Sequence, residues 1–163
     1  MKIIDNQRLD SLSEEAKLSK RLRKNLNLHT ESVDPIQRLL NALEPDTYIC
    51  PHKHENPDKR ELFMLIRGNL SVLIFNDLGE IEHAFRLSNN SNCKIVEIES
   101  RKWHSVVCHE PGTIYFELKD GPYDPDNDKN FAPWAPAEFD LNSVDYLIQL
   151  KMKISKIESA QII

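Results

Sequence analysis

Residues 50–69 read CPHKHENPDKRELFMLIRGN, and they hold the most informative pattern of the chain. It holds His52 and His54, one residue apart, with Glu61 seven residues further on. Side chains at positions i and i+2 of a β-strand point to the same face. Imidazole and carboxylate groups are common ligands of zinc, iron, nickel and manganese. With His104 as a third imidazole from a later strand, the pattern indicates a metal site inside a small β-barrel.

The sequence around this stretch predicts further short strands separated by turns. One strand is expected at Ile36–Leu43, between Pro35 and Pro45. Gly68-Asn69 is typical of a hairpin turn. The other strands are expected near 47–54, 61–67, 70–76, 82–87, 94–98, 104–109 and 113–119. Several short strands at this spacing favour a sandwich or a barrel.

Three segments are expected in one folded unit. Residues 1–34 form an N-terminal helical extension, with an amphipathic helix within 6–24 and a polar connection after it. Residues 35–119 form the barrel, and residues 120–163 pack on it. The Pro-rich part of this last segment, 120–138, is expected to be an irregular strap.

The C-terminal tail fits two secondary structures. Ile148, Leu150, Met152 and Ile154 alternate with polar residues, which is the period of a strand. Leu150 and Ile154 also belong to a helical stripe with Leu147. The sequence does not decide between strand and helix.

Composition excludes several classes of partner. The net charge of -5 gives no reason to expect nucleic acid or an anionic membrane as partner. No apolar run approaches the ~20 residues that span a bilayer. Three cysteines without a CxxC pattern fit a reducing compartment, so a cytoplasmic location is expected. The apolar tail and the N-terminal helix favour a homodimer.

The histidine pattern resembles that of the cupin family. The first cupin motif places HxH, a glutamate and a glycine in this order, which His52, His54, Glu61 and Gly68 match, and the second motif supplies His104. The resemblance implies a mainly β, single-domain cupin: a double-stranded β-helix, or jelly-roll barrel, with an N-terminal helical extension. It also implies one divalent transition metal (Zn, Fe, Mn or Ni) held by the three histidines and Glu61.

The chain departs from the cupin pattern in its turn residues. The loop between His54 and Glu61 is longer than usual and must bulge. Asp46 replaces the first glycine of the pattern, and Glu99 and Arg101 replace the Pro and Gly before His104. These changes affect the loop geometry before His104 more than the ligands themselves.

A closer resemblance, over about residues 10–138, is to the WbuC-type cupin-fold metalloproteins. Its supporting stretches include 37–45, 103–107 and 110–113, and its most specific part is 121–136 in the strap. The resemblance implies a bacterial protein associated with surface-polysaccharide (O-antigen) biosynthesis, in a family without a settled reaction.

Several ligand roles stay open. Glu61 is either a metal ligand or a carboxylate that orients a histidine. Cys50 shares the strand parity of His52, and Cys108 that of His104, so each is a buried apolar residue or a thiolate near the metal. The other histidines, His29, His83 and His109, have no partner at ligand spacing and are expected to be structural.

Four further residues are candidates for a substrate pocket. Arg38 could grip an anionic group with its guanidinium, or lie on the surface. Tyr48 shares the parity of the HxH pair and is a second candidate for substrate binding. Tyr115 and Glu117 share one face of the last barrel strand, where they are candidate catalytic residues or ordinary barrel surface.

Two functions follow from these residues. The first is a metal-dependent enzyme acting on a small molecule, such as a carbohydrate intermediate. A redox-inert metal would suit an isomerase or epimerase, or a hydrolase, and Fe(II) would suit a dioxygenase. The second is a non-catalytic, metal-dependent binding or sensor protein, because a fold does not fix an activity. An open metal position beside a general base would favour the enzyme.

Overall fold

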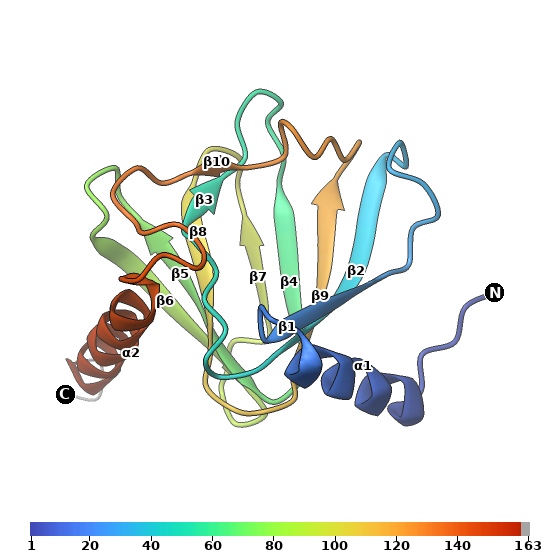
Figure 1. Cartoon of the computed structure of the whole chain (residues 1–163), viewed down its shortest axis with the longest axis horizontal. Coiled ribbons are helices and arrows are strands. Elements are labelled where there is room, and N and C mark those ends of the chain that lie inside the picture. Colours follow the sequence, from blue (N-terminus) through green and yellow to red (C-terminus); the bar gives the residue numbers. More distant parts are fainter. Residues whose placement is uncertain (161–163) are drawn as a thin grey trace.

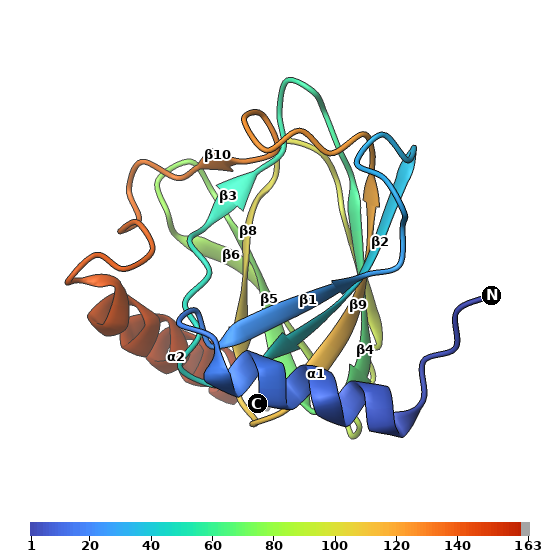
Figure 2. The ribbon, with the colours of Figure 1, turned by 45° about the vertical axis from the view of Figure 1, so that its right-hand side comes forward.

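Alternating apolar residues build two antiparallel sheets that face each other. The computed structural model describes residues 1–160, and within them each sheet has five strands. The first sheet has the order β1 (Arg23–Asn27), β2 (Ile36–Leu43), β9 (Thr113–Asp120), β4 (Glu61–Arg67) and β7 (Ile95–Ile98). The second has the order β10 (Asn130–Phe131), β3 (His52–Lys53), β8 (Trp103–Cys108), β5 (Asn69–Phe75) and β6 (Ile81–Ser88). Figures 1 and 2 show the two sheets enclosing the barrel interior.

The structure confirms the mainly β, single-domain fold and corrects parts of the strand pattern. Strands β2 and β4 have the expected bounds. The strand expected at 47–54 is reduced to His52–Lys53, because residues 47–51 run as irregular chain. The connection expected after the N-terminal helix is also wrong in part, since it contains β1, which pairs with β2 along its whole length.

The helix α1 (Asn6–Leu18) covers the outer face of the first sheet. Asp5 caps it by accepting a hydrogen bond from the Arg8 backbone N–H at 2.9 Å. Its buried Leu9, Leu12 and Ala16 pack against outward-facing residues of β2 and β9. This packing leaves the opposite face of β2 to line the barrel interior.

The tail forms a helix, which settles the ambiguity between strand and helix. Helix α2 (Ser143–Ala160) buries Leu147, Leu150 and Ile154 against the outer face of the second sheet, where Leu73 and Val107 lie (Figure 1). The spacing of three and four residues matches one helical face. Among residues 1–160, no helix is both long and apolar enough to cross a membrane.

Candidate metal centre and its cavity

The four expected ligands come together from both sheets. His52 and His104 are directly paired across β3 and β8, and His54 follows β3 at once. Glu61 begins β4 in the opposite sheet. The carboxylate oxygens of Glu61 lie 3.0 Å from His54 Nε2 and 2.9 Å from His104 Nε2. One donor atom from each of the four buried side chains lies within 4.8 Å of the others.

Backbone carbonyls fix the orientation of all three imidazoles. His52 Nδ1 donates to the Cys50 carbonyl at 2.9 Å, and His104 Nδ1 donates to the Lys102 carbonyl at 2.9 Å. His54 Nδ1 donates to the carbonyl of Asp128. A carbonyl can only accept, so each Nδ1 carries a proton, and in the neutral imidazole the lone pair is then on Nε2, which faces the cluster. Burial also lowers the pKa of His52 well below its usual value, which keeps that imidazole neutral.

The inward-facing atoms of this cluster lack hydrogen bonds. His54 Nε2, His104 Nε2 and one Glu61 oxygen are buried without a hydrogen-bond partner among the described residues. Imidazole lone pairs that face a carboxylate at about 3 Å repel it unless a proton or a metal cation lies between them. An ion bound at ~2.1 Å holds its donors about 3–4 Å apart, which agrees with the observed spacings. The cluster of three histidines and Glu61 therefore fits a metal site, with Glu61 close enough to be a direct ligand.

The turn before His104 forms without the usual glycine. Arg101 takes the left-handed backbone conformation itself, with φ 65°. Its backbone N–H donates to the His54 carbonyl at 3.0 Å, and its guanidinium pairs with Asp58 at 2.9 Å. These contacts tie the turn to the loop after the HxH pair. The changed turn residues thus leave the ligand geometry intact.

The long loop between His54 and Glu61 supplies a buried lysine. Lys59 donates to Asp128 Oδ1 at 2.9 Å and to the Pro122 carbonyl at 2.6 Å. Lys119, on β9, donates to the other Asp128 oxygen at 2.7 Å. Burial raises the pKa of Asp128, but Lys119 and Lys59 outweigh it and lower the pKa overall. The strap residue that orients His54 is therefore itself held by two ammonium groups.

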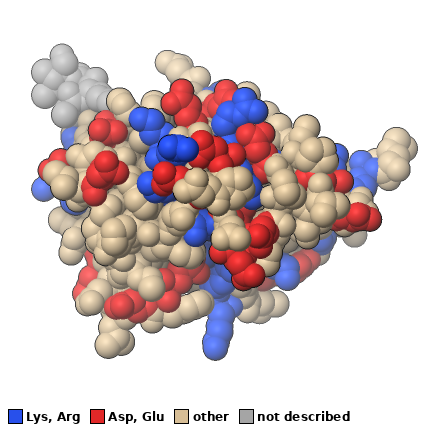
Figure 3. Space-filling model, turned by 90° about the horizontal axis from the view of Figure 1, so that it is seen from above, with Lys and Arg blue, Asp and Glu red and all other residues tan. Residues whose placement is uncertain are grey.

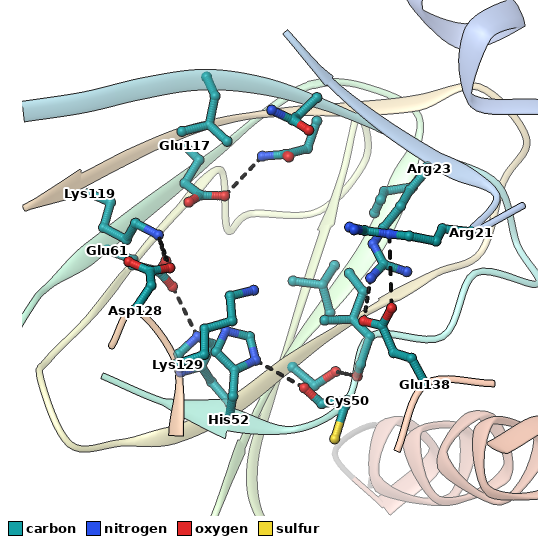
Figure 4. Close-up of a pocket in the computed structure, with 18 of the residues that line it drawn as sticks. Arg21, Arg23, Cys50, His52, Glu61, Glu117, Lys119, Asp128, Lys129 and Glu138 are labelled. Carbon is teal, nitrogen blue, oxygen red and sulfur yellow. Dashed lines mark hydrogen bonds and ion pairs between the residues drawn. The ribbon is translucent and has the colours of Figure 1, made fainter. Parts of the chain in front are cut away.

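A cavity of about 1290 Å³ opens beside the cluster. His52, Glu61 and His104 all line it, so a bound metal would face its interior. Figure 4 shows the charged groups that surround the same space. The wall near β1 and β2 carries His29, the cationic Arg23 and Lys24 of β1, and side chains without a formal charge. The latter are Asn25, Asn27, Ser32, Gln37 and Asn41.

Glu117 and Tyr115 both line this cavity from β9. Asn41 Nδ2 donates to Glu117 Oε2 at 2.9 Å, and no ammonium or guanidinium of the described residues pairs with Glu117. Burial, and then the negative charge of Glu61, raise the pKa of Glu117 to about 7. Burial and the neighbouring Glu117 raise the pKa of Tyr115 well above its usual value. Near neutral pH, Glu117 can therefore exchange a proton, whereas Tyr115 keeps its phenolic hydrogen.

One family matches just over half of the chain. It is described as "Domain of unknown function (DUF6016)", and it matches residues 4–87. The chain belongs to the DUF6016 family. The matched region includes the HxH pair and Glu61 but ends before His104. No curated protein matches the chain.

Solved structures give the fold of this DUF6016 member. The capsular polysaccharide assembling protein CapF of Staphylococcus aureus is 19% identical with a TM-score of 0.56, and the match covers 70% of this chain and 32% of CapF. Oxalate decarboxylase of Bacillus subtilis is 15% identical with a TM-score of 0.51, over 67% of this chain and 27% of the enzyme. A cupin 2 domain-containing protein of Halorhodospira halophila is 14% identical with a TM-score of 0.49, over 82% of this chain and 81% of that one. At these identities the matches to CapF and oxalate decarboxylase show that the chain shares their cupin fold, and they show no activity. They span only about a third of CapF and about a quarter of oxalate decarboxylase.

The structure places the two expected substrate-binding residues outside the cavity. Arg38 shares the outward parity of Leu40 and Ala42 on β2, and its guanidinium lies 3.4 Å from Asp34. Asn41, on the other face of the same strand, lines the cavity instead. Tyr48 packs against α2 and donates its hydroxyl to the Pro136 carbonyl at 2.7 Å. Neither Arg38 nor Tyr48 is therefore positioned to contact a ligand beside the metal centre.

The cysteines are core residues rather than ligands. Cys108 packs in the barrel core and directs its thiol to the Glu110 carbonyl at 3.1 Å. Cys50 lines the cavity but packs with the residues under α2, and its thiol points to the Pro51 carbonyl at 3.6 Å. Burial raises the pKa of both thiols, so both remain protonated.

Sequence reasoning missed four charged residues of the site. One of them, Lys59, lies in the irregular loop before Glu61, where no strand period predicts its direction. Lys119 shares the parity of Glu117 on β9, so strand alternation could have identified it. Asp128 and Lys129 belong to the strap, where irregular backbone gives no period from which to read a direction. Their only signal was their presence in the most specific part of the WbuC-type resemblance.

Proposed function

We propose that this protein is a metal-dependent enzyme that moves a proton on a small molecule. The observation that carries the proposal is a buried cluster of three histidines and a glutamate that borders the cavity, together with Glu117, a cavity carboxyl whose pKa is raised to about 7. A general acid or base is most effective when its pKa is near the working pH. This combination favours isomerase or epimerase chemistry over a closed, non-catalytic metal site.

His52, His54, His104 and Glu61 would hold one divalent metal, with zinc, iron, manganese and nickel all compatible with the donor set. When bound, such a metal would polarise a carbonyl or hydroxyl oxygen of the substrate. Glu117 would take a proton from the adjacent carbon and return it to a neighbouring position, so no further reactant is needed. Tyr115, which stays protonated, would donate a hydrogen bond to a substrate oxygen. With Fe(II) in the same ligands, a dioxygenase is the second candidate.

A carbohydrate is the proposed substrate class. Side-chain amides both donate and accept hydrogen bonds, which suits the hydroxyl groups of a sugar. Asn25, Asn27 and Asn41 place such amides on one cavity wall. The WbuC-type resemblance supports a place in surface-polysaccharide biosynthesis, as does the shared fold of CapF, a capsular polysaccharide assembling protein. We also propose a cytoplasmic location, which the three free cysteines support.

Metal analysis is the first test. Protein purified without chelating resin should contain one equivalent of a first-row metal by mass spectrometry. The double variant His52→Ala with His54→Ala should lose it, whereas His83→Ala should retain it because His83 is outside the cluster. Wild-type protein that neither contains nor takes up metal would refute the metalloprotein part.

Solvent exchange tests the catalytic part. Metal-loaded protein is incubated in heavy water with reducing sugars and with their phosphates. We expect deuterium to replace hydrogen on the sugar carbon next to the carbonyl group, and NMR detects this exchange. Glu117→Gln should abolish this exchange and keep the metal. Exchange that persists in Glu117→Gln would rule out its role. If the wild type binds metal and catalyses no exchange, the non-catalytic binding or sensor function is favoured.

A further inference from the structure

Lys129 is a cation of the cavity without an anionic partner. Its side chain projects from the strap into the space beside His52 (Figure 4). Among residues 1–160, no carboxylate lies within ion-pair distance of its ammonium group, whereas Lys59 and Lys119 both pair with Asp128. Solvent reaches the side chain because the cavity is open, but the enclosing walls remove enough hydration to lower the pKa of Lys129.

The strap holds Lys129 in a fixed position. The preceding residue, Asp128, is 4% exposed and bonded to two lysines. The following residue, Asn130, begins β10 and pairs with Lys53 in the second sheet. A lysine between two anchored residues has little backbone freedom, so only its side chain has to be ordered when a ligand binds. This preorganisation reduces the entropy that a ligand contact would cost.

The charges around the cavity favour an anion. Near the metal centre, Lys119 and Lys129 line the cavity, and Lys59 lies behind Asp128. These three ammonium groups are close to two carboxylates, Asp128 and Glu61, and to the partly protonated Glu117. The other cationic residues of the cavity are paired separately, Arg21 and Arg23 with Glu138 and Lys24 with Glu15. A divalent metal would add two positive charges to this balance. The excess is local to the cavity, because Figure 3 shows acidic and basic side chains intermixed on the surface at this end.

We propose that Lys129 is the anion-binding residue of the cavity, and that the ligand carries a carboxylate or a phosphate group. This inference rests on the proposed function, because it names the substrate class of the same site. The anionic group contacts the Lys129 ammonium, and an uncharged oxygen elsewhere in the ligand reaches the cluster of three histidines and Glu61. Lysine suits this role because its ammonium group is a compact positive charge that can donate hydrogen bonds to a carboxylate or to a phosphate. In this arrangement Lys129 selects the ligand, whereas Glu117 serves the proton transfer.

Three sugars that share one ring test the inference. Zinc-loaded wild-type protein is titrated with glucuronate, glucose 6-phosphate and glucose, and binding is measured by calorimetry. At least one of the two anions should bind about tenfold more tightly than glucose, and the stronger one identifies carboxylate or phosphate as the preferred group. Equal affinity for all three sugars, or no binding by either anion, would overturn the inference.

Variants of one position show whether Lys129 provides this preference. Lys129→Gln should lose the preference for the anion, so its affinity for the anionic sugar should fall about tenfold. Lys129→Arg should bind that sugar within about threefold of the wild-type affinity. Lys153→Gln, an exposed lysine on α2, is the matched control and should bind as wild type does. An unchanged preference in Lys129→Gln would overturn the inference.

Zinc content separates this inference from the proposed function. Lys129→Gln should retain one equivalent of zinc, since Lys129 is not part of the cluster. If the variant loses zinc, Lys129 supports the metal centre and the anion role is refuted. If zinc is retained and the anion preference is absent from wild type, only the substrate class fails, and the metal-dependent function stands.

Discussion

Replacing Asp128 by asparagine should weaken both the fold and the metal centre. Asp128 is 4% exposed, and its two oxygens accept from Lys59 at 2.9 Å and from Lys119 at 2.7 Å. Asp128→Asn removes the counter-charge that two buried ammonium groups share, and it leaves Lys119 only the more distant Glu61, at 3.9 Å. Removing one partner of a buried ion pair typically costs about 3–5 kcal/mol. Asparagine keeps one acceptor oxygen, and Lys59 keeps the Pro122 carbonyl, so we expect a loss of about 3 kcal/mol in the free energy of unfolding.

The same substitution should reduce metal affinity about 10–100-fold. The backbone carbonyl of Asp128 accepts a hydrogen bond from His54 Nδ1, so the strap directly orients one of the proposed metal ligands. Loss of a group that orients a metal-bound histidine typically has an effect of this size. The backbone carbonyl persists in Asp128→Asn, and the weakening arises because the anchor that holds it in place is lost.

Two assays measure these effects on the same preparation. Urea unfolding of the metal-free protein gives the stability, and competition with a chromogenic chelator gives the affinity for zinc. The control is Asp126→Asn, the same substitution at an exposed position of the strap. The pKa of Asp128 is lowered in the fold, so its contribution is present above about pH 4 and is lost only as the pH falls through that lowered pKa. The difference between Asp128→Asn and wild type should therefore be constant between about pH 5 and pH 8 (about 3 kcal/mol).

A double-mutant cycle decides whether the ion network is the cause. Lys59→Met removes one of the two ammonium groups, so the pair of changes should cost less than the sum of the single changes. A coupling free energy of about 1–3 kcal/mol is expected for residues in one network. Additive effects, or an Asp128→Asn variant within about 0.5 kcal/mol of wild type, would refute the reasoning.

Three further predictions follow from single side chains. The pKa of Glu117 is raised from 4.5 to about 7 in the folded protein. Between these two pH values the folded protein keeps a proton that the unfolded chain has released, so the free energy of unfolding of the wild type falls as the pH rises from about 4.5 to about 7. Metal-free Glu117→Gln, which mimics the protonated form, should therefore gain stability over wild type between about pH 5 and pH 8, by up to about 3 kcal/mol in urea unfolding. The exposed Glu97→Gln is the control and should show no such gain. A difference between Glu117→Gln and wild type that does not change with pH would contradict this prediction. Leu150, on the buried face of α2, is 2% exposed, so Leu150→Ala should lower the free energy of unfolding by about 2–5 kcal/mol. A loss below about 1 kcal/mol would show that α2 is only loosely packed. We propose that the expected homodimer forms through the exposed apolar face of α2, where Ile148 is 50% and Met152 57% exposed. Ile148→Glu should therefore yield monomers in light scattering. A dimer that persists in this variant would place the interface elsewhere.

The sequence predicts the barrel and the metal ligands for a common reason. Both depend on strand alternation, which is local and has a fixed period of two. His52 and His54 therefore point to one side, and the parity of β9 brings Tyr115 and Glu117 to the cavity. For β2, strand alternation does not predict which of its two faces points into the barrel. The packing of α1 against Leu40 and Ala42 decides between them, and this tertiary contact turns Arg38 outward.

Irregular segments carry what the sequence could not predict. Tyr48 was assigned by strand parity, but residues 47–51 are not in a strand, so the parity argument does not apply to them. The tail was ambiguous because its apolar residues fit two periods, and only the apolar outer face of the second sheet selects the helix. The directions of Asp128 and Lys129 depend on contacts with Lys59 and β3, which lie far away in the chain.

The strap connects the two parts of the site through adjacent residues. Asp128 orients His54 and so acts on the metal centre, and Lys129 faces the cavity that would hold the ligand. If a ligand anion contacts Lys129, it also restrains the backbone that carries the Asp128 carbonyl. Binding energies coupled in this way must be reciprocal, so an anion that binds more tightly with metal present must also tighten the metal. The affinity for zinc, measured with and without the preferred anion, should therefore rise by the same factor as the affinity for the anion does on adding zinc.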